Sequence, residues 1–208
     1  MHPTAPSSLR ARKKAETWAA IHEAAAALVV ERGTDGTTVE AVAEAAGVSP
    51  RTFFNYFRTK EDAILGMRAP ALDPALLEDF SPEHDLLGQV SRLLLAVARS
   101  AYAGGDASRR RELLREYPQL ALRRRELTTE AEELVRRALV DLLAADPRWA
   151  DGLGEHDVDE AARMLVLLAG VPLHFAISSA HHSPAAGLTP EEHESALDLF
   201  HRLERRLA

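Results

Sequence analysis

A nine-residue segment, SPRTFFNYF (residues 49–57), concentrates side chains that can recognise DNA bases and phosphates. If a helix begins at Pro50, one of its faces presents Pro50, Arg51, Phe54 and Asn55 together. Arginine can hydrogen bond to guanine, asparagine can pair with adenine, and an apolar ring can contact a thymine methyl group. The face therefore suits the major groove of DNA, although helical hairpins of this kind also occur in proteins that never bind DNA.

The aromatic residues of the segment divide by helical spacing into two pairs. Phe53 and Phe57 lie four residues apart, so they share one face and are expected to form the core beneath two short helices. Phe54 then lies on the opposite face. Tyr56 lies at the edge with Thr52, where a hydroxyl group could reach a phosphate.

Helix start and stop signals predict the elements that hold this segment. A first helix is expected over residues 11–32, ending at Gly33. A second would begin at Thr37, which could form a capping box with Glu40, and would end at Gly47. A short second helix followed after a glycine turn by a third is the helix-turn-helix arrangement.

The third and fourth helices have their own N-terminal signals. Ser49 is the expected N-cap of the third, with Pro50 as its first residue. Thr59 is the expected N-cap of the fourth, with Asp62 as its acidic partner, and this helix is expected to reach Arg68.

Beyond residue 67 the chain is predicted to be helical as well. Pro70, Pro74 and Pro82 indicate a linker or broken helix over residues 68–85. No segment alternates with period two, so no sheet is expected. We predict an all-α protein of about nine helices, the later five spanning residues 85–102, 107–116, 118–145, 158–180 and 190–207.

Charge and composition restrict the classes of function. The net charge is −7, but residues 1–60 hold eight basic and six acidic side chains, so a nucleic-acid partner would bind this N-terminal part. Cysteine is absent, which excludes disulfides and thiolate chemistry. Neither a signal peptide nor a run of about 18 apolar residues is evident, so we expect a cytoplasmic protein without membrane contact.

Residues 12–66 resemble the DNA-binding signature of the TetR family of bacterial transcriptional regulators. The resemblance is carried by the segment TTVEAVAEAAGVSPRTFFNYFRTKEDAI. The resemblance implies a flexible arm (1–10), a three-helix helix-turn-helix domain (11–67), and a helical ligand-binding and dimerisation domain (68–208). It also implies a homodimer that reads a palindromic operator. Family positions near bases match Pro50, Arg51, Phe54 and Asn55, and those near phosphates match Thr38, Thr52, Tyr56 and Lys60. The family often has tyrosine where this chain has Phe54.

The resemblance also implies roles for the C-terminal helices. In the family the last two long helices commonly form a four-helix bundle across a dimer. The segment 161–180 is apolar nearly all round, so it must be buried in its own chain or against a partner. Eight candidates for an effector pocket lie on helices that the family places around its cavity, with ordinary core packing as the alternative for each: Leu94, Tyr102, Leu114, Tyr117, Leu134, Met164, His174 and Phe175.

The arginine runs 109–111 and 123–125 are expected to be solvated faces paired with nearby glutamates, or else to contact an anionic headgroup. The region around them faintly resembles actinobacterial regulators, including the mycofactocin regulator type, that respond to acyl-coenzyme A. An acyl-CoA-like effector is therefore one candidate.

Neither a metal nor a cofactor is expected. His181, His182 and His193 lie among residues typical of an exposed loop, and no catalytic motif accompanies them. The leading hypothesis is an effector-released repressor in which the fourth helix links the DNA-binding part to the body. An activator would use the same residues. The alternative class is a helical enzyme or ligand carrier that does not bind DNA.

Overall fold

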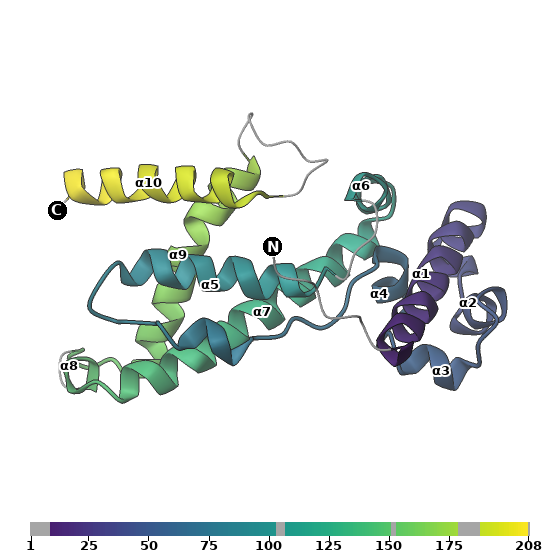
Figure 1. Cartoon of the computed structure of the whole chain (residues 1–208). Coiled ribbons are helices and arrows are strands. Elements are labelled where there is room, and N and C mark those ends of the chain that lie inside the picture. The colour runs from purple at the N-terminus through teal and green to yellow at the C-terminus, as the bar shows by residue number, and fades with distance from the viewer. Residues whose placement is uncertain (1–8, 103–106, 151–152, 179–187, 208) are drawn as a thin grey trace, which may run out of the picture. The chain divides into compact units, whose positions relative to one another are not determined.

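The computed structural model describes residues 9–102, 107–150, 153–178 and 188–207, and within these ranges all regular structure is helical (Figure 1). The predicted fold class is confirmed. The elements are α1 (Leu9–Gly36), α2 (Val39–Ala45), α3 (Pro50–Phe54), α4 (Lys60–Leu65), the 3-10 helix η1 (Pro74–Leu77), α5 (Leu86–Ser100), α6 (Ala107–Glu116), α7 (Pro118–Ala144), α8 (Pro147–Ala150), α9 (Val158–Ser178) and α10 (Pro190–Leu207).

Two compact units divide the described residues. The first contains residues 9–68 and 113–123, so it holds α1 to α4, the end of α6 and the start of α7. The second contains residues 69–102, 107–112 and 124–207. Both α6 and α7 therefore contribute residues to each unit.

The first unit is built on the apolar stripe of α1, as the sequence predicted. Ile21, Ala25 and Val29 of α1 are fully buried. The helix breaks at Gly33, whose φ of 69° is a positive value that favours glycine. At its other end α1 already includes Leu9 and Arg10, which the sequence had assigned to a flexible arm.

Two helix starts in the first unit differ in detail from the prediction. The N-cap of α2 is Thr38, which accepts a hydrogen bond from the backbone of Ala41 at 3.2 Å, and not Thr37. Thr37 is buried and donates to the carbonyl of Gly33 at 2.8 Å, so its hydroxyl group is already engaged. Two adjacent threonines offer the same signal, and only burial selects between them.

Helix α4 is shorter than predicted, because it ends at Leu65 with Gly66 as its left-handed C-cap. Thr59 is its N-cap, as expected. The carboxylate of Asp62 does not complete a capping box, since it binds Arg123. In the C-terminal half, α8 is a single turn that was not predicted.

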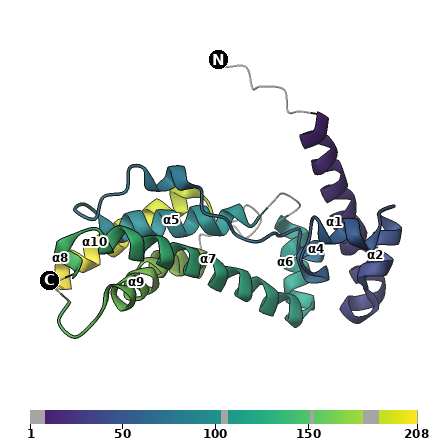
Figure 2. The same cartoon turned by 90° about the horizontal axis from the view of Figure 1, so that it is seen from below.

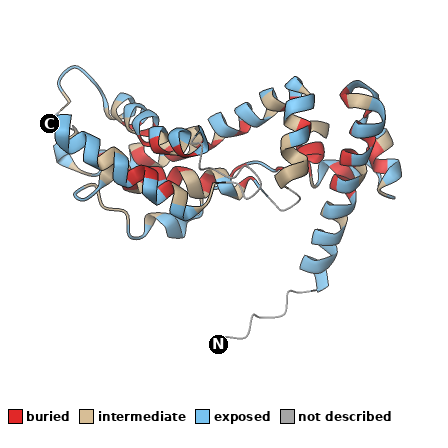
Figure 3. Ribbon diagram, turned by 90° about the horizontal axis from the view of Figure 1, so that it is seen from above, coloured by how far each residue is buried: buried red, intermediate tan, exposed pale blue. Residues whose placement is uncertain are grey.

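The second unit has a core formed by α5, α7 and α9. Fully or nearly fully buried side chains from the three helices meet there, among them Val90, Leu94, Val135, Leu139 and Ala162. One apolar side of each helix faces this common interior. Figure 3 shows these buried residues on the inner sides of the helices.

Helix α9 buries one side in this core and leaves another side exposed. Ala162, Val166 and Ala169 are buried, whereas Leu167 and Ile177 are more than half exposed. By length and composition alone, α9 is apolar enough to cross a membrane. In the folded chain 28% of the apolar 18-residue stretch of α9 is buried. The prediction from the sequence, which relied on unbroken apolar runs, missed this property. Apolar side chains of α10, including Leu203, are also exposed.

Candidate nucleic-acid interface

The turn between α2 and α3 is set by local backbone hydrogen bonds. Gly47, with a φ of 66°, lets the chain reverse after α2, and the amide of Val48 bonds back to Ala43 at 2.9 Å. Ser49 then caps α3 by accepting a hydrogen bond from the amide of Thr52 at 3.0 Å. The predicted N-cap and first residue of α3 are therefore confirmed.

The four aromatic residues after Thr52 take two kinds of position. Phe53 is fully buried and Phe57 is 2% exposed, and their ring centroids lie 5.8 Å apart. Trp18 of α1 packs against Phe57 with ring centroids 5.3 Å apart. Phe54 is 58% exposed. The assignment of Phe53 and Phe57 to the core and of Phe54 to the outer face is thus what the structure shows.

The outer face of α3 presents the residues expected to contact bases. Pro50, Arg51, Phe54 and Asn55 are all exposed. Asn55 is the C-cap of α3, but the amide of Phe57 still bonds to the carbonyl of Phe53 at 3.0 Å, so helical geometry continues past it. A cation, an amide and an aromatic ring therefore share one accessible surface.

The residues expected to contact phosphates lie around this face with their polar groups partly engaged. Thr38 is exposed, and its oxygen accepts the capping bond of α2 while its proton stays available as a donor. The hydroxyl groups of Thr52 and Ser49 lie 2.9 Å apart. Tyr56 is half-buried. Lys60 donates to the carbonyl of Thr34 at 2.6 Å, which uses one of its three protons.

Hydrogen bonds join the start of α7 to α1 within the first unit. The hydroxyl of Tyr117 donates to the carbonyl of Val29 at 3.0 Å. The side-chain amide of Gln119 donates to the hydroxyl oxygen of Thr34. These bonds join residues more than 80 positions apart in the chain, so no local sequence signal could reveal them.

A buried ion pair joins the same part of α7 to α4. Asp62 is 1% exposed, and both of its carboxylate oxygens accept hydrogen bonds from the Arg123 guanidinium, at 2.8 Å and 3.1 Å. Arg58 approaches the same carboxylate at 3.9 Å. The expectation that Arg123 belongs to a solvated face is therefore wrong, whereas Arg124 and Arg125 are exposed.

The eight candidates for the effector cavity occupy different environments. In the second unit, Leu94 is part of the core cluster and Leu134 packs against it. Met164, His174 and Phe175 are exposed on α9.

The remaining three candidates are on or near α6. Tyr102 is 41% exposed, with the guanidinium carbon of Arg110 4.8 Å from its ring centroid. Leu114 is half-buried. Tyr117 belongs to the first unit and binds Val29 as described above.

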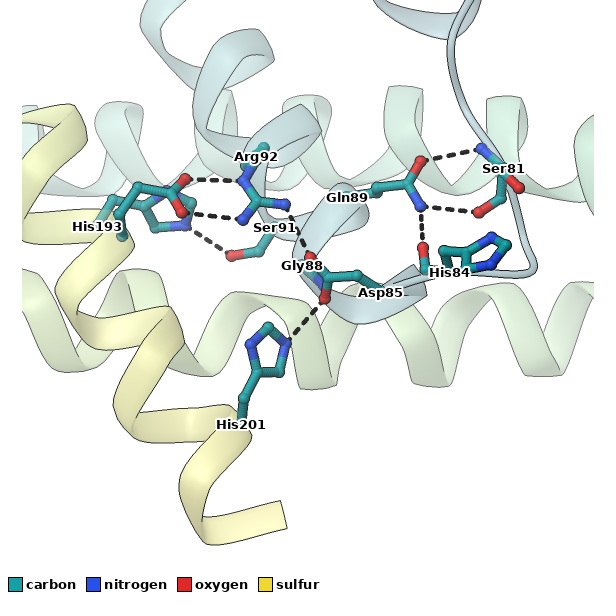
Figure 4. A network of polar contacts seen from close by, with 10 residues as sticks. Ser81, His84, Asp85, Gly88, Gln89, Ser91, Arg92, His193 and His201 are labelled. Atoms are coloured by element: carbon teal, nitrogen blue, oxygen red, sulfur yellow. Dashed lines mark hydrogen bonds and ion pairs between the residues drawn. The ribbon is translucent and has the colours of Figure 1, made fainter. Parts of the chain in front are cut away.

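An open cleft of about 620 Å³ lies elsewhere in the second unit, between α5 and α10. It is lined by charged residues and by leucines such as Leu86 and Leu197, and none of the eight candidates lines it. Figure 4 shows the polar network beside it, in which Arg92 donates to Glu194 at 2.7 Å and to Asp85 at 2.9 Å. The hydrogen bond with Glu194 raises the pKa of Arg92, and the same bond lowers the pKa of Glu194.

His193 lies in this network and not in an exposed loop. It is 1% exposed, and its Nε2 lies 2.8 Å from the hydroxyl of Ser91 on α5 (Figure 4). Burial lowers the pKa of His193 below its ordinary value. His181 and His182 lie outside the described residues. Within the described ranges, no group of three or more potential ligands is placed to hold a metal ion.

The helix-turn-helix geometry agrees with a match to a known protein family. The family model described as bacterial regulatory proteins, tetR family, matches residues 21–65, which run from the buried part of α1 to the end of α4. Residues 21–65 form a TetR-family helix-turn-helix domain. The HTH-type transcriptional regulator TcmR of Streptomyces glaucescens is 41% identical to this chain over 75 residues.

The similarity to TcmR covers 36% of this chain and 32% of TcmR, so it includes about a third of that relative's length. A TetR-family transcriptional regulator of Mesorhizobium loti is 20% identical with a TM-score of 0.36, covering 92% of this chain and 98% of its own. The fatty acid degradation regulator FadR of Bacillus halodurans is 17% identical with a TM-score of 0.30, covering 94% and 97%. Both TM-scores lie below 0.5, so neither structure defines how the helices of this chain are arranged.

Proposed function

We propose that this chain is a homodimeric, cytoplasmic transcriptional regulator that binds a palindromic DNA operator through α3. The observation that supports this most directly is the division of the aromatic residues after Thr52. Phe53 and Phe57 are buried, and this leaves Arg51, Phe54 and Asn55 on one exposed face. In the major groove these three side chains would contact guanine, a thymine methyl group and adenine.

The phosphate contacts in this proposal come from the border of the same face. Thr38, Thr52, Tyr56 and Lys60 each carry a hydroxyl or ammonium group that can donate to a phosphate oxygen. The side chains of Thr38 and Lys60 use only part of their hydrogen-bonding capacity for bonds within the protein. These contacts would orient α3 and would make affinity fall with rising salt.

Dimerisation is proposed to occur through the exposed apolar sides of α9 and α10. Leu167, Val171 and Ile177 on α9 are between 50% and 60% exposed, and Leu199 and Leu203 on α10 are 40% and 50% exposed. Soluble monomers rarely expose large apolar patches, so exposed apolar side chains on two helices in contact favour a protein partner. A second copy of the chain would cover it and would set two α3 helices to read two half-sites.

We further propose repression that a small effector relieves, with acyl-CoA-like molecules as one candidate class. Such an effector can act only by favouring one arrangement of the two DNA-binding units. Residues 113–123 of α6 and α7 belong to the first unit, and the bonds of Tyr117, Gln119 and Arg123 offer a path for that coupling in addition to α4.

The test of the DNA-binding proposal compares the wild-type chain with a variant carrying Arg51→Ala and Asn55→Ala. An operator would first be selected from random duplexes, and binding measured by fluorescence anisotropy. The variant is expected to lose sequence discrimination, at about 1 to 3 kcal/mol for each base contact. Its stability should be unchanged, because both side chains are exposed.

Arg137→Ala is a matched control, since Arg137 is an exposed arginine on α7. If the double variant kept full sequence-specific affinity, the outer face of α3 would not be the reading face. If the wild-type chain showed no salt-dependent binding to any duplex, a helical ligand carrier or enzyme would replace the regulator.

A further inference from the structure

The packed stripe of α1 changes from apolar to basic before it reaches the N-terminus of the helix. Ile21 and Ala25 are fully buried on this stripe, and Trp18 is half-buried. Residues four and eight positions before Trp18 are Lys14 and Arg10, which a helix places on the same line. Both are exposed.

A second line along α1 repeats the change. Thr17 and Lys13 precede Ile21 by four and eight positions, so they continue its line towards the N-terminus. Lys13 is exposed, and its carbonyl accepts a hydrogen bond from the Thr17 hydroxyl at 3.0 Å. Lys13 and Lys14 lie three and four residues after Arg10, so the three cations form one basic cluster before the helix enters the core.

Acidic residues in this part of α1 lie on the opposite side. Arg12 and Glu16 form an i,i+4 pair at 3.5 Å, and Glu23 follows on the same side. Glu16 lies three residues from Lys13 and so beside it, whereas neither Arg10 nor Lys14 has an acidic residue three or four positions away. A helix with cations on one side and compensated charges on the other is suited to a partner with dense negative charge.

The basic turns begin where α1 passes the end of α3. Trp18 packs on Phe57, which in turn packs on Phe53 of α3. Residues 9–17 extend beyond this contact by about 13 Å at 1.5 Å per residue. Figure 2 shows this end of α1 projecting away from α2 and α4, and Figure 3 shows its surface as exposed.

We propose that Arg10, Lys13 and Lys14 bind the phosphate backbone of the DNA that flanks the segment read by α3. This inference rests on the proposed function. Arg10 and Lys14 are separated by about 6 Å along the helix axis, and phosphates follow each other every ~3.4 Å along the axis on one strand, so the two side chains reach different phosphates. Because these residues are helical, their spacing is established before binding, and little ordering entropy is lost.

The experiment compares two exposed arginines that lie two residues apart on opposite sides of α1. Arg10→Gln removes a proposed phosphate contact, and Arg12→Gln removes the same charge from the other side. A third variant combines Arg10→Gln, Lys13→Gln and Lys14→Gln. Binding of each full-length chain to a long, fluorescein-labelled duplex of mixed sequence is measured between about 50 mM and 200 mM salt. Circular dichroism confirms that helix content is equal.

The expected result is a change in the slope of log affinity against log salt. Arg10→Gln should reduce its magnitude by about 0.9, the triple variant by about 0.9 for each phosphate that is no longer neutralised, and Arg12→Gln should leave it unchanged. If the wild type binds with a steep slope and the triple variant keeps that slope, the inference is wrong while the proposed function stands. Equal losses in Arg10→Gln and Arg12→Gln would also overturn it, because net charge alone would then explain binding. Absence of salt-dependent binding by the wild type would refute both.

Discussion

Replacing Arg123 by methionine should destabilise the first unit by about 3 kcal/mol, which is the low end of the cost of breaking a buried ion pair. Asp62 is 1% exposed, and both of its oxygens accept charge-assisted hydrogen bonds from Arg123. Without the guanidinium, the carboxylate would remain buried and lose both bonds. We expect the low end because Arg58, at 3.9 Å from the carboxylate and half exposed, can move closer and compensate in part.

The measurement is urea unfolding followed by far-ultraviolet circular dichroism, at one protein concentration because a dimer's stability depends on concentration. A double variant, Asp62→Leu with Arg123→Met, removes both charges and should recover most of the lost stability, since apolar replacement of a buried pair is often neutral. A loss below about 1 kcal/mol in the single variant, or no recovery in the double variant, would show that the pair does not stabilise the unit in this way.

Three further predictions follow from burial and exposure. Phe54→Ala should weaken operator binding without altering the thermal midpoint, whereas Phe53→Ala should cost about 3 to 5 kcal/mol of stability; equal effects on the midpoint would contradict the assigned faces. Leu167→Glu combined with Leu203→Glu should yield folded monomers in light scattering, and a persistent dimer would place the interface elsewhere. Burial lowers the pKa of His193, so the unfolded chain binds the proton more readily. Stability should therefore decline as the pH drops below about 6.5, the ordinary histidine pKa, and His193→Gln should weaken this dependence; identical pH profiles of urea unfolding would rule it out.

Much of the helical architecture could be predicted because its signals are local. The bounds of α6 and α10 were predicted without error, and α7 differs by one residue at its end. Caps and apolar spacing act within one or two turns, so they are visible in a short window of sequence. The same local spacing is enough to separate Phe53 and Phe57 from Phe54.

Errors in the predictions from sequence arose where the partner of a side chain is distant in the chain. Arg123 belongs to a basic run that the sequence predicts to be exposed, but its side chain binds Asp62, which lies 61 residues earlier. His193 reads as part of an exposed loop, but it bonds to Ser91, 102 residues away. Thr37 and Thr38 carry the same capping signal, and the burial of Thr37 against the end of α1 decides which of them caps α2.

By itself, the sequence determined that this protein is helical, that it carries a TetR-family helix-turn-helix, and which side of α3 faces outward, because periodicity and capping need only neighbouring residues. Only the tertiary structure decided which charged groups are buried and which apolar sides remain open. The apolar pattern of α9 requires burial but does not say by what. In the folded chain one side of α9 packs against α5, α7 and α10, while Leu167 and its neighbours stay exposed, because the packing of these helices determines how much of α9 a single chain can cover.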